Sequence, residues 1–417
     1  MLEVRGFRGY RFNTDVVGTL DNAVTPPFDV ITPAERARLA ALSPYNMMHV
    51  LLPEPADGLD PYQNAARHLE TWIDGGALVQ DDEESFYLLE QVFQGLDGNE
   101  HARRAFFARV RVPEPEEDLI LDHERTFDTK VADRMRLTEE TQANLGAVFV
   151  LYADPDGALQ PFLGQMDARE PDAVARTADG VTQRLWRVPA DERVSAHFRS
   201  RKLYIADGHH RFRTAREYRD RMRAANPGAG EQPYDFVLMG LVAFDDPGLV
   251  VWPTHRLLDI PEAFDLDVVL AQLDPWFEIE PVRERLAERI DGSPGCAIGL
   301  AVHGRGQYLL TLRDVDRAEM LGADRTDAWR NLDVVVLHRG ILERMFGLEE
   351  GVELVYEARF DTALAAVEAG EKGLAFFVKS TPTEQVVACA DAHDPMPEKA
   401  TYFFPKLPSG AVIHRLR

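Results

Sequence analysis

Hydrophobic and polar positions alternate in short runs along this chain, and these runs predict strands. The segments SFYLLEQVFQG (85–95) and HARRAFFARVRV (101–112) are separated by a polar turn and predict a β-hairpin. QRLWRVP (183–189) and the apolar runs on both sides of the Asp246-Pro247-Gly248 turn predict further strands. The run YNMMHVLLP (45–53) predicts a buried strand.

Helical spacing dominates other segments. DPYQNAARHLETWIDGGAL (60–78) carries apolar residues three or four positions apart and ends in two glycines, which predicts a helix. Another helix is expected after Thr32, a plausible N-cap followed by Pro33 at the first helical position and Glu35 at the third. RLTEETQANLGAVFVLYAD (136–154) predicts a helix that leads into a buried strand.

The order of these elements predicts an α+β fold, because the regular alternation of a doubly wound parallel sheet is missing. At 417 residues the chain is long enough for two to three domains. We expect a core over 1–258, with an N-terminal elaboration and an insertion near 155–200, in which the polar stretch 155–179 is an insertion or a loop. A second α+β subdomain is expected over 259–417, and its tail is a candidate to return to the core.

Charge and cysteine content limit the class of protein. The formal net charge of −24 disfavours broad binding of nucleic acid, although a local cationic site can still bind a small anion. The two cysteines indicate a reducing compartment. The N-terminal residues lack an apolar signal core and no apolar run is long enough to span a membrane, so we expect a soluble, cytoplasmic protein without a membrane partner.

The segment KLYIADGHHRFRTAREY is the strongest candidate for chemistry. A strand is expected to end at Asp207, Gly208 permits a tight turn, and a helix then begins with His209, His210 and Arg211. The free N–H groups and dipole of a helix start favour an anion, and arginine adds a bidentate fork for phosphate or carboxylate. The alternative is a basic turn packed by chance against acidic residues. Cations in a first turn oppose the helix dipole, however, and a bound anion would remove that conflict.

Asp207 has two interpretations. Its carboxylate is a candidate Mg²⁺ ligand beside a phosphate, and it is equally a candidate cap for the following helix. The histidine pair does not suggest a zinc site, because adjacent histidines point apart and no HExxH or cysteine partner exists.

Other polar residues within apolar surroundings are weaker candidates for the lining of a cleft. Asp29 in PPFDVITP and His255-Arg256 in PTHRL fit a cleft, and strand-end salt bridges explain them nearly as well. Lys399 and Lys406, two of only six lysines, flank the aromatic strand TYFF. They could reach a phosphate, or they could protect an edge strand.

The block YIADGHHRFRTA resembles the core signature of the ParB/sulfiredoxin-like superfamily, in which a strand, a turn and a helix bind nucleotide phosphate. The Asp-Gly-His-His-Arg form is similar to the branch that contains free-serine kinases. Over most of its length the chain resembles a bacterial domain-of-unknown-function family, DUF 1015. The blocks that carry this resemblance are PPFDVITP, SPYNMMHV, LDHERT, YIADGHHRFRTA, PTHRL and MPEKATYFFPKLPSG.

The resemblance to the serine-kinase branch implies roles for LDHERT. Glu124 matches the carboxylate that acts as base toward a substrate hydroxyl, with His123 beside it and Thr126 in the same block. It also implies ATP or ADP with Mg²⁺ as cofactors. About fifty residues separate the strand 147–152 from the signature here, whereas the branch has almost none, so the acceptor pocket is expected to differ. Without the resemblance, DHERT would be interpreted as a solvated loop.

The sequence therefore favours a nucleotide-dependent phosphotransferase acting on a small hydroxylated metabolite, with a serine-like amino acid as one candidate. No Walker A or kinase glycine-rich loop is present, so the phosphate site is expected at 208–211. The alternative is a ParB-like nucleotide-binding switch without turnover, although no helix-turn-helix is evident. A nuclease is disfavoured because no dense acidic cluster occurs, and the sulfiredoxin reaction because the turn has no cysteine.

Overall fold

A computed structural model of the protein describes residues 1–260, 264–343 and 354–417. The chain forms two compact units: the first comprises 1–122, 126–249 and 405–417, and the second comprises 123–125 and 250–404. The first unit thus reaches Leu249 and also includes the last thirteen residues, 405–417. Each unit is described separately.

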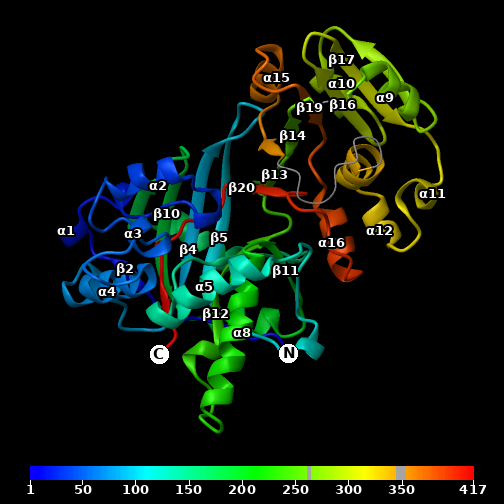
Figure 1. The fold of residues 1–417 in the computed structure, drawn as a ribbon. Helices are drawn as coiled ribbons and strands as arrows, with labels where there is room; N and C mark the ends of the chain where they lie inside the picture. The colour runs from blue at the N-terminus through cyan, green and yellow to red at the C-terminus, as the bar shows by residue number, and fades with distance from the viewer. Residues whose placement is uncertain (261–263, 344–353) are drawn as a thin grey trace. The chain divides into compact units, whose positions relative to one another are not determined.

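The first unit is built on a mixed nine-stranded sheet with the order β6-β11-β8-β12-β5-β4-β10-β9, in which β1 also pairs with β5 (Figure 1). Its strands are β1 (Val4–Arg5), β4 (Ser85–Gln94), β5 (Glu100–Arg111), β6 (Ile120–Leu121), β8 (Val148–Tyr152), β9 (Ala173–Arg176), β10 (Thr182–Pro189), β11 (Leu203–Asp207) and β12 (Phe236–Ala243). The pairs β6–β11 and β8–β12 are parallel, and the other pairs in this sheet are antiparallel. The predicted hairpin is confirmed as β4 and β5.

Helices and two small sheets complete the first unit. The helices are α1 (Thr14–Val17), α2 (Pro33–Ala40), α3 (Met48–Leu51), α4 (Pro61–Asp74), α5 (Asp128–Thr141), α6 (Gln160–Leu163), α7 (Glu192–Phe198) and α8 (His209–Ala225), with 3₁₀ turns η1 (Leu20–Asn22), η2 (Phe28–Val30), η3 (Pro115–Glu117), η4 (Gly164–Ala168) and η5 (Pro233–Asp235). β2 (Tyr10–Phe12) pairs with β3 (Leu78–Gln80), and β7 (Ala143–Asn144) pairs with β21 (His414–Arg415). Helix α5 packs against both α4 and α8.

The predicted helix starts are confirmed by their capping geometry. Thr32 and Glu35 form a reciprocal capping box at α2, with Pro33 as the first helical residue. Asp60 caps α4 in the same way, and Gly75 is its C-cap. The sequence could predict these helix starts because a cap depends only on residues within one turn of each other.

In the first unit, one sequence-based prediction is wrong and one alternative for another segment does not hold. The segment 45–53 contains the helix α3 instead of a strand, because its apolar run is too short to show a period and the Asn46 side chain accepts a hydrogen bond from the Met48 N–H at 3.0 Å. The segment 155–179 is not simply a loop, since it forms α6, η4 and β9. Asp154 accepts hydrogen bonds from the N–H groups of residues 158 and 159 and so organises the turn before α6.

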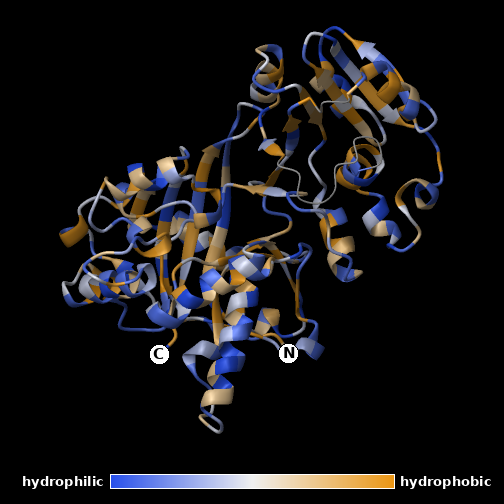
Figure 2. Ribbon diagram, in the orientation of Figure 1, coloured by the Kyte–Doolittle hydropathy of each residue, from blue (hydrophilic) through white to orange (hydrophobic). Residues whose placement is uncertain are grey.

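The C-terminal residues are part of the first unit's core. Ile413 is fully buried and bridges to Tyr10, and Ser409 bridges to Thr25. In Figure 1 this red segment lies among the blue and green elements of the unit. Figure 2 shows hydrophobic residues concentrated along the strands of the sheet, while helix α8 is largely hydrophilic.

The second unit contains a six-stranded sheet in the order β15-β17-β16-β19-β14-β18, and its described pairs are all antiparallel. Its strands are β14 (His255–Leu258), β15 (Phe277–Val282), β16 (Ala297–Val302), β17 (Gly306–Leu312), β18 (Val355–Glu357) and β19 (Leu374–Phe377), and β13 (Val250–Trp252) pairs separately with β20 (Tyr402–Phe404). Its helices include α9 (Leu266–Leu273), α10 (Leu286–Gly292), α11 (Arg317–Leu321), α12 (Asp327–Arg330), α13 (Asp333–Val335), a π-helical segment (Val336–Glu343), α15 (Phe360–Glu368) and α16 (Thr383–Asp391).

Both units combine helices with largely antiparallel strands, so the fold is α+β. In the part of the chain that the structure describes, no helix is long and apolar enough to cross a membrane.

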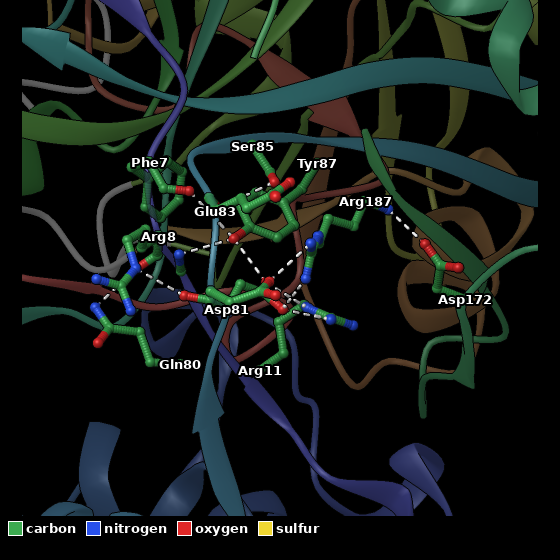
Figure 3. Close-up of polar contacts among 12 residues, drawn as sticks. Phe7, Arg8, Arg11, Gln80, Asp81, Glu83, Ser85, Tyr87, Asp172 and Arg187 are labelled. Carbon is green, nitrogen blue, oxygen red and sulfur yellow. Dashed lines mark hydrogen bonds and ion pairs between the residues drawn. The ribbon is translucent and has the colours of Figure 1, made fainter. Parts of the chain in front are cut away.

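A buried ionic cluster around Asp81 joins the N-terminal strands of the first unit to the large sheet (Figure 3). The Asp81 carboxylate accepts hydrogen bonds from Arg11 at 2.7 and 2.9 Å, from the Tyr87 hydroxyl at 2.8 Å and from Arg187 at 3.0 Å. Burial alone would raise the pKa of Asp81, but the bonds from Arg11 and Tyr87 outweigh burial and lower it. The cluster thus holds an ionised carboxylate inside the unit.

Candidate functional site

The strand, turn and helix predicted for the signature segment are present in the first unit (Figure 1). β11 ends at Asp207, Gly208 is the N-cap with φ of 91°, and α8 begins at His209. A Cβ atom on Gly208 would lie 3.0 Å from three atoms of the Arg211 guanidinium. Glycine is therefore favoured here both by the left-handed backbone and by the close approach of Arg211. Residues 208–211 are called the Gly208 turn below.

Asp207 is buried beneath this turn and contacts two cations. Its Oδ2 accepts a hydrogen bond from Arg211 Nη2 at 2.5 Å, and its Oδ1 accepts one from Lys406 Nζ. Burial opposes ionisation, but the charges of Lys406 and Arg211 outweigh it and hold the pKa of Asp207 far below its usual range. Because Gly208 itself occupies the N-cap position, the alternative that Asp207 caps the helix does not hold.

Arg211 is fixed over the start of α8. Its Nη1 donates to the carbonyl of Ala147, just before β8, while its Nη2 donates to Asp207. The neighbouring Gly146 leaves room for this arrangement, since a Cβ there would lie 2.8 Å from the Ser409 hydroxyl and 3.7 Å from Arg211 Nη1. The guanidinium is therefore held in one orientation by two parts of the chain.

Lys406 reaches Asp207 because the sheet core holds its backbone. Gln91 Nε2 donates to the Lys406 carbonyl at 3.0 Å, and the fully buried Arg103 donates to the Pro405 carbonyl. Lys406 thus protects no exposed strand edge, as its side chain is only 11% exposed. From the sequence, Lys406 was expected either to contact a phosphate or to protect an edge strand. Its pairing with Asp207 was missed, because the two residues are 199 positions apart.

The two histidines of the turn differ in their surroundings. His209 is buried, and its charge contributes to the low pKa of Asp207. His210 Nε2 accepts a hydrogen bond from the Phe127 N–H at 3.0 Å, and its ring stacks on that of Phe127. An accepting Nε2 is unprotonated, so the neutral ring carries its proton on Nδ1. Thr126 is held nearby, because its hydroxyl accepts from Arg213 at 3.1 Å.

A cavity in the first unit borders Arg211. It is lined mainly by apolar side chains, with polar groups from Arg134, Asn144, Thr214 and Ser409. The complete lining is Pro27, Phe28, Leu51, Arg134, Leu137, Thr138, Ala143, Asn144, Leu145, Gly146, Val148, Arg211, Thr214, Ala215, Val237 and Ser409. The guanidinium of Arg134 lies 4.2 Å from the centre of the Phe28 ring. Asp29 follows Phe28 but is exposed and is not part of the lining.

Other predicted site residues lie together in the second unit. His123 is buried, its Nε2 lies 3.3 Å from the Thr401 hydroxyl, and its carbonyl accepts from Met396 N at 2.8 Å. Glu124 is half-buried and forms a parallel bridge with Met396. The segments DHERT and MPEKAT therefore run side by side. The predicted role of Glu124 as a base toward a group bound at the Gly208 turn stays a prediction.

Arg256 is a fully buried cation in the second unit. It donates to Thr254 Oγ1 at 2.8 Å, to the Lys399 carbonyl at 3.1 Å and to His338 Nε2 at 3.2 Å. Burial lowers the pKa of Arg256 to about 10, and burial followed by the charge of Arg256 lowers that of His338 to about 3. Within the described residues, Arg256 has no carboxylate at ion-pair distance.

His255 packs in the hydrophobic interior of the second unit. Its ring contacts those of Phe360 and Phe377, and burial lowers its pKa to about 4. At 4% and 0% exposed, neither His255 nor Arg256 lines an open cleft, which differs from the expectation for both. The strand alternation of PTHRL could not reveal this, because both faces of β14 are covered.

The donor atoms do not fit a magnesium site made by the protein alone. Both Asp207 oxygens accept hydrogen bonds from cations, and among the described residues no three His, Cys, Asp or Glu side chains are grouped for metal binding. Mg²⁺ requires several oxygen ligands in octahedral geometry. The expected role of Asp207 as a metal ligand is therefore not favoured by its surroundings.

Several solved structures are distantly similar to this chain. A conserved hypothetical protein from Pyrococcus furiosus is 14% identical, with a TM-score of 0.35 over 73% of this chain and 93% of that one. A free serine kinase in complex with AMP is 13% identical, with a TM-score of 0.36 over 71% and 86% of the two chains. C-terminally truncated SbnI from Staphylococcus aureus is 10% identical, with a TM-score of 0.35 over 72% and 84%. Similarity at these scores supports no argument about function.

No curated protein matches the sequence. A family model does match it, from residue 4 to residue 335, which is well over half of the chain. The chain therefore belongs to the family described as "Protein of unknown function (DUF1015)".

Proposed function

We propose that the protein is a nucleotide-dependent phosphotransferase acting on a small hydroxylated metabolite, and that the Gly208 turn binds phosphate. The observation that carries this proposal is the fixed guanidinium of Arg211 above the start of α8. The first N–H groups of a helix lack intrahelical partners and favour an anion. A phosphate would accept from these groups while lying beside Arg211.

The charge pattern around Asp207 supports the same function. Basic residues in a first turn destabilise a helix unless an anion compensates them. Asp207 compensates only from the strand side, where it holds both Arg211 and Lys406. A phosphate on the other side of the Arg211 guanidinium would neutralise the positive charge that Asp207 leaves uncompensated. Because Arg211 is already held in place, its side chain would lose little conformational entropy when the phosphate binds.

We propose the cavity beside Arg211 as the site of the nucleoside. Its lining is largely apolar with a few polar groups, as is usual for small-molecule sites. It adjoins Arg211, so a base and ribose there would place phosphates toward the turn. ATP or ADP is the expected nucleotide.

Glu124 is the proposed base toward the acceptor hydroxyl, with His123 adjacent. This role follows from the resemblance of LDHERT to the serine-kinase branch, in which the matching carboxylate acts as the base. A carboxylate can orient and deprotonate an alcohol within hydrogen-bond reach. Serine and related hydroxy acids are the first acceptors to test. No step is assigned to a metal.

Nucleotide binding is tested by thermal unfolding with ATP, ADP and GTP, each with and without Mg²⁺. A ligand at about one hundred times its Kd stabilises the native state by about 2.7 kcal/mol. Arg211→Ala should weaken binding by about 1.5–3 kcal/mol, the usual contribution of charge-assisted hydrogen bonds. Arg221→Ala is the matched control, since Arg221 lies on the same helix in an exposed ion pair with Glu139. Equal affinity in the Arg211 and Arg221 variants would contradict the proposed phosphate site.

Turnover separates a kinase from a binding switch. With a bound donor and a panel of hydroxyl metabolites, mass spectrometry should detect a phosphorylated product. Glu124→Gln should leave nucleotide binding nearly unchanged and reduce turnover by about 10²–10⁴-fold, as expected for a lost general base. Clear nucleotide binding without a product from any acceptor would favour the ParB-like switch instead.

A further inference from the structure

The backbone of Lys399 has an unusual conformation. Its φ angle is +55°, in the left-handed region that residues with a Cβ atom rarely adopt. The residue lies in the second unit between the bridge at Met396 and strand β20. Glycine would fit this position at lower energetic cost, so the presence of lysine requires an explanation.

Two side chains from the neighbouring β14 region hold this conformation. The Lys399 carbonyl accepts from Thr254 Oγ1 at 2.7 Å and from Arg256 Nη2 at 3.1 Å. Arg256 also donates to the Thr254 hydroxyl, so the three residues form one connected set. Arg256 is completely buried, and a buried guanidinium is costly to retain. One of its hydrogen bonds holds the Lys399 carbonyl directly, and another holds the Thr254 hydroxyl that donates to the same carbonyl, while a third goes to His338.

The Lys399 ammonium group differs from those of the other lysines. Within the described ranges, the half-buried Lys399 side chain makes no hydrogen bond or ion pair. Each of the other lysines has a partner: Lys130 lies over the Phe127 ring, Lys202 pairs with Asp118, Lys372 with Asp259 and Lys406 with Asp207, and Lys379 donates to the carbonyls of Ser293 and Gly295. Lys399 is thus a cation on a fixed backbone whose charge is still available.

We propose that Lys399 binds an anionic oxygen group of a small-molecule ligand, with Thr254 and Arg256 as its positioning residues. Backbone strain held by surrounding structure is characteristic of functional positions. An ammonium on a fixed backbone loses less freedom when it binds an anion. The observations behind this inference lie in the second unit alone, and the choice of ligand rests on the function proposed above. The anionic group is a nucleotide phosphate or the carboxylate of an acceptor.

Lys399→Gly tests the inference while preserving the backbone. Glycine accepts the left-handed conformation, so the melting temperature should stay unchanged or rise. Binding is measured by calorimetry with ADP, with D-glycerate and L-serine, and with uncharged glycerol. We expect Lys399→Gly to weaken binding of at least one anionic probe by about 10- to 100-fold, and Lys399→Arg to retain most of it.

Arg285→Gly is the matched control, because Arg285 is a basic residue of the same unit with φ of +62° and an exposed side chain. This control should bind every probe as the wild type does. A selective loss for ADP identifies the ligand group as phosphate, and a selective loss for glycerate or serine identifies it as carboxylate.

The inference is overturned if Lys399→Gly binds all anionic probes normally, or if the wild type binds none of them. A marked fall in the melting temperature would also overturn it, by showing a structural role for the side chain. Loss of ADP binding in Arg211→Ala with normal probe binding in Lys399→Gly would leave the proposed function intact and reject only this inference.

Discussion

Arginine side chains bind three of the buried carboxylates of this protein. Asp81 is bound by Arg11 and Arg187, Asp207 by Lys406 and Arg211, and Asp394 by Arg325 at 2.6 Å. The pKa of each carboxyl group is lowered, because these partners outweigh the effect of burial. The guanidinium group is suited to this task, since its planar fork donates several hydrogen bonds to one carboxylate.

We expect Asp81→Asn to lower the free energy of unfolding by about 3 kcal/mol at pH 7. The substitution leaves two arginines beside a neutral amide in a largely buried position, and breaking a buried ion pair costs about 3–5 kcal/mol. Asp82→Asn is the control, as its carboxylate is 80% exposed and pairs with Arg187 at 2.9 Å. Surface pairs contribute about 0–1 kcal/mol. Urea denaturation measures both, and equal losses would contradict this account.

The same variant gives a pH dependence with a defined sign. Because the pKa of Asp81 is lower in the folded than in the unfolded state, its ionised form stabilises the protein above the unfolded pKa, about 4. This contribution is lost as pH falls through the folded pKa. The stability difference between wild type and Asp81→Asn should therefore be constant near neutral pH and shrink below about pH 4. A difference that grows on acidification would be inconsistent with the lowered pKa.

At the scale of elements, the junction of β11 and α8 combines local and long-range constraints. The strand, the glycine and the helix start follow from sequence patterns within about ten residues. The position of Arg211 depends in addition on Ala147 and on Asp207, which in turn holds Lys406. The turn is therefore preorganised by the surrounding unit rather than by its own residues alone.

Gly208→Ala should destabilise the protein and weaken nucleotide binding together. An L-residue at φ of +91° costs about 1–3 kcal/mol, and its Cβ would press against the Arg211 guanidinium at 3.0 Å. Gly228→Ala is the control, because Gly228 has φ of +85° but a Cβ atom there would have no other atom within 4 Å. Calorimetry with ADP and thermal unfolding should separate the two variants. If both lose the same stability and neither loses affinity, crowding of Arg211 has no role.

At the scale of the whole molecule, the first unit is assembled from three separate stretches of the chain. The second unit is contributed mainly by 250–404, and the chain then re-enters the first unit at Pro405. The overall charge is −24, yet Arg211 and Lys406 place positive charge around Asp207. A strongly acidic protein can therefore carry a local site suited to an anion.

Removal of residues 405–417 should unfold the first unit. The segment buries Leu407, Val412, Ile413 and Leu416, each contributing about 1.5–3 kcal/mol, against a typical domain stability of about 5–15 kcal/mol. Circular dichroism and limited proteolysis should show this loss. Deletion of Arg417 alone removes only an exposed ion pair with Glu70 and should be nearly neutral. A truncated chain that still melts cooperatively with a full-length melting temperature would contradict the role of this segment.

Much of the local structure could be predicted from the sequence. The capping box at Thr32, the glycine end of α4, the hairpin of β4 and β5 and the turn at Gly208 all depend on residues close in the chain. The helix α3 was missed because a short apolar run fits a strand or a helix equally well, and the structure within 155–179 was missed because that polar stretch shows no clear apolar period. Packing against the rest of the first unit decides among these.

The sequence by itself determined the chemical type of the candidate site: a glycine turn followed by basic residues at a helix start. Only the tertiary structure decided which residues accompany it. Lys406, which lies close to the C-terminus, pairs with Asp207, whereas His255 and Arg256 are buried in the second unit. Pairings of this kind join residues far apart in sequence, and no local pattern encodes them, because they depend on how the strands between those residues are ordered in the sheets.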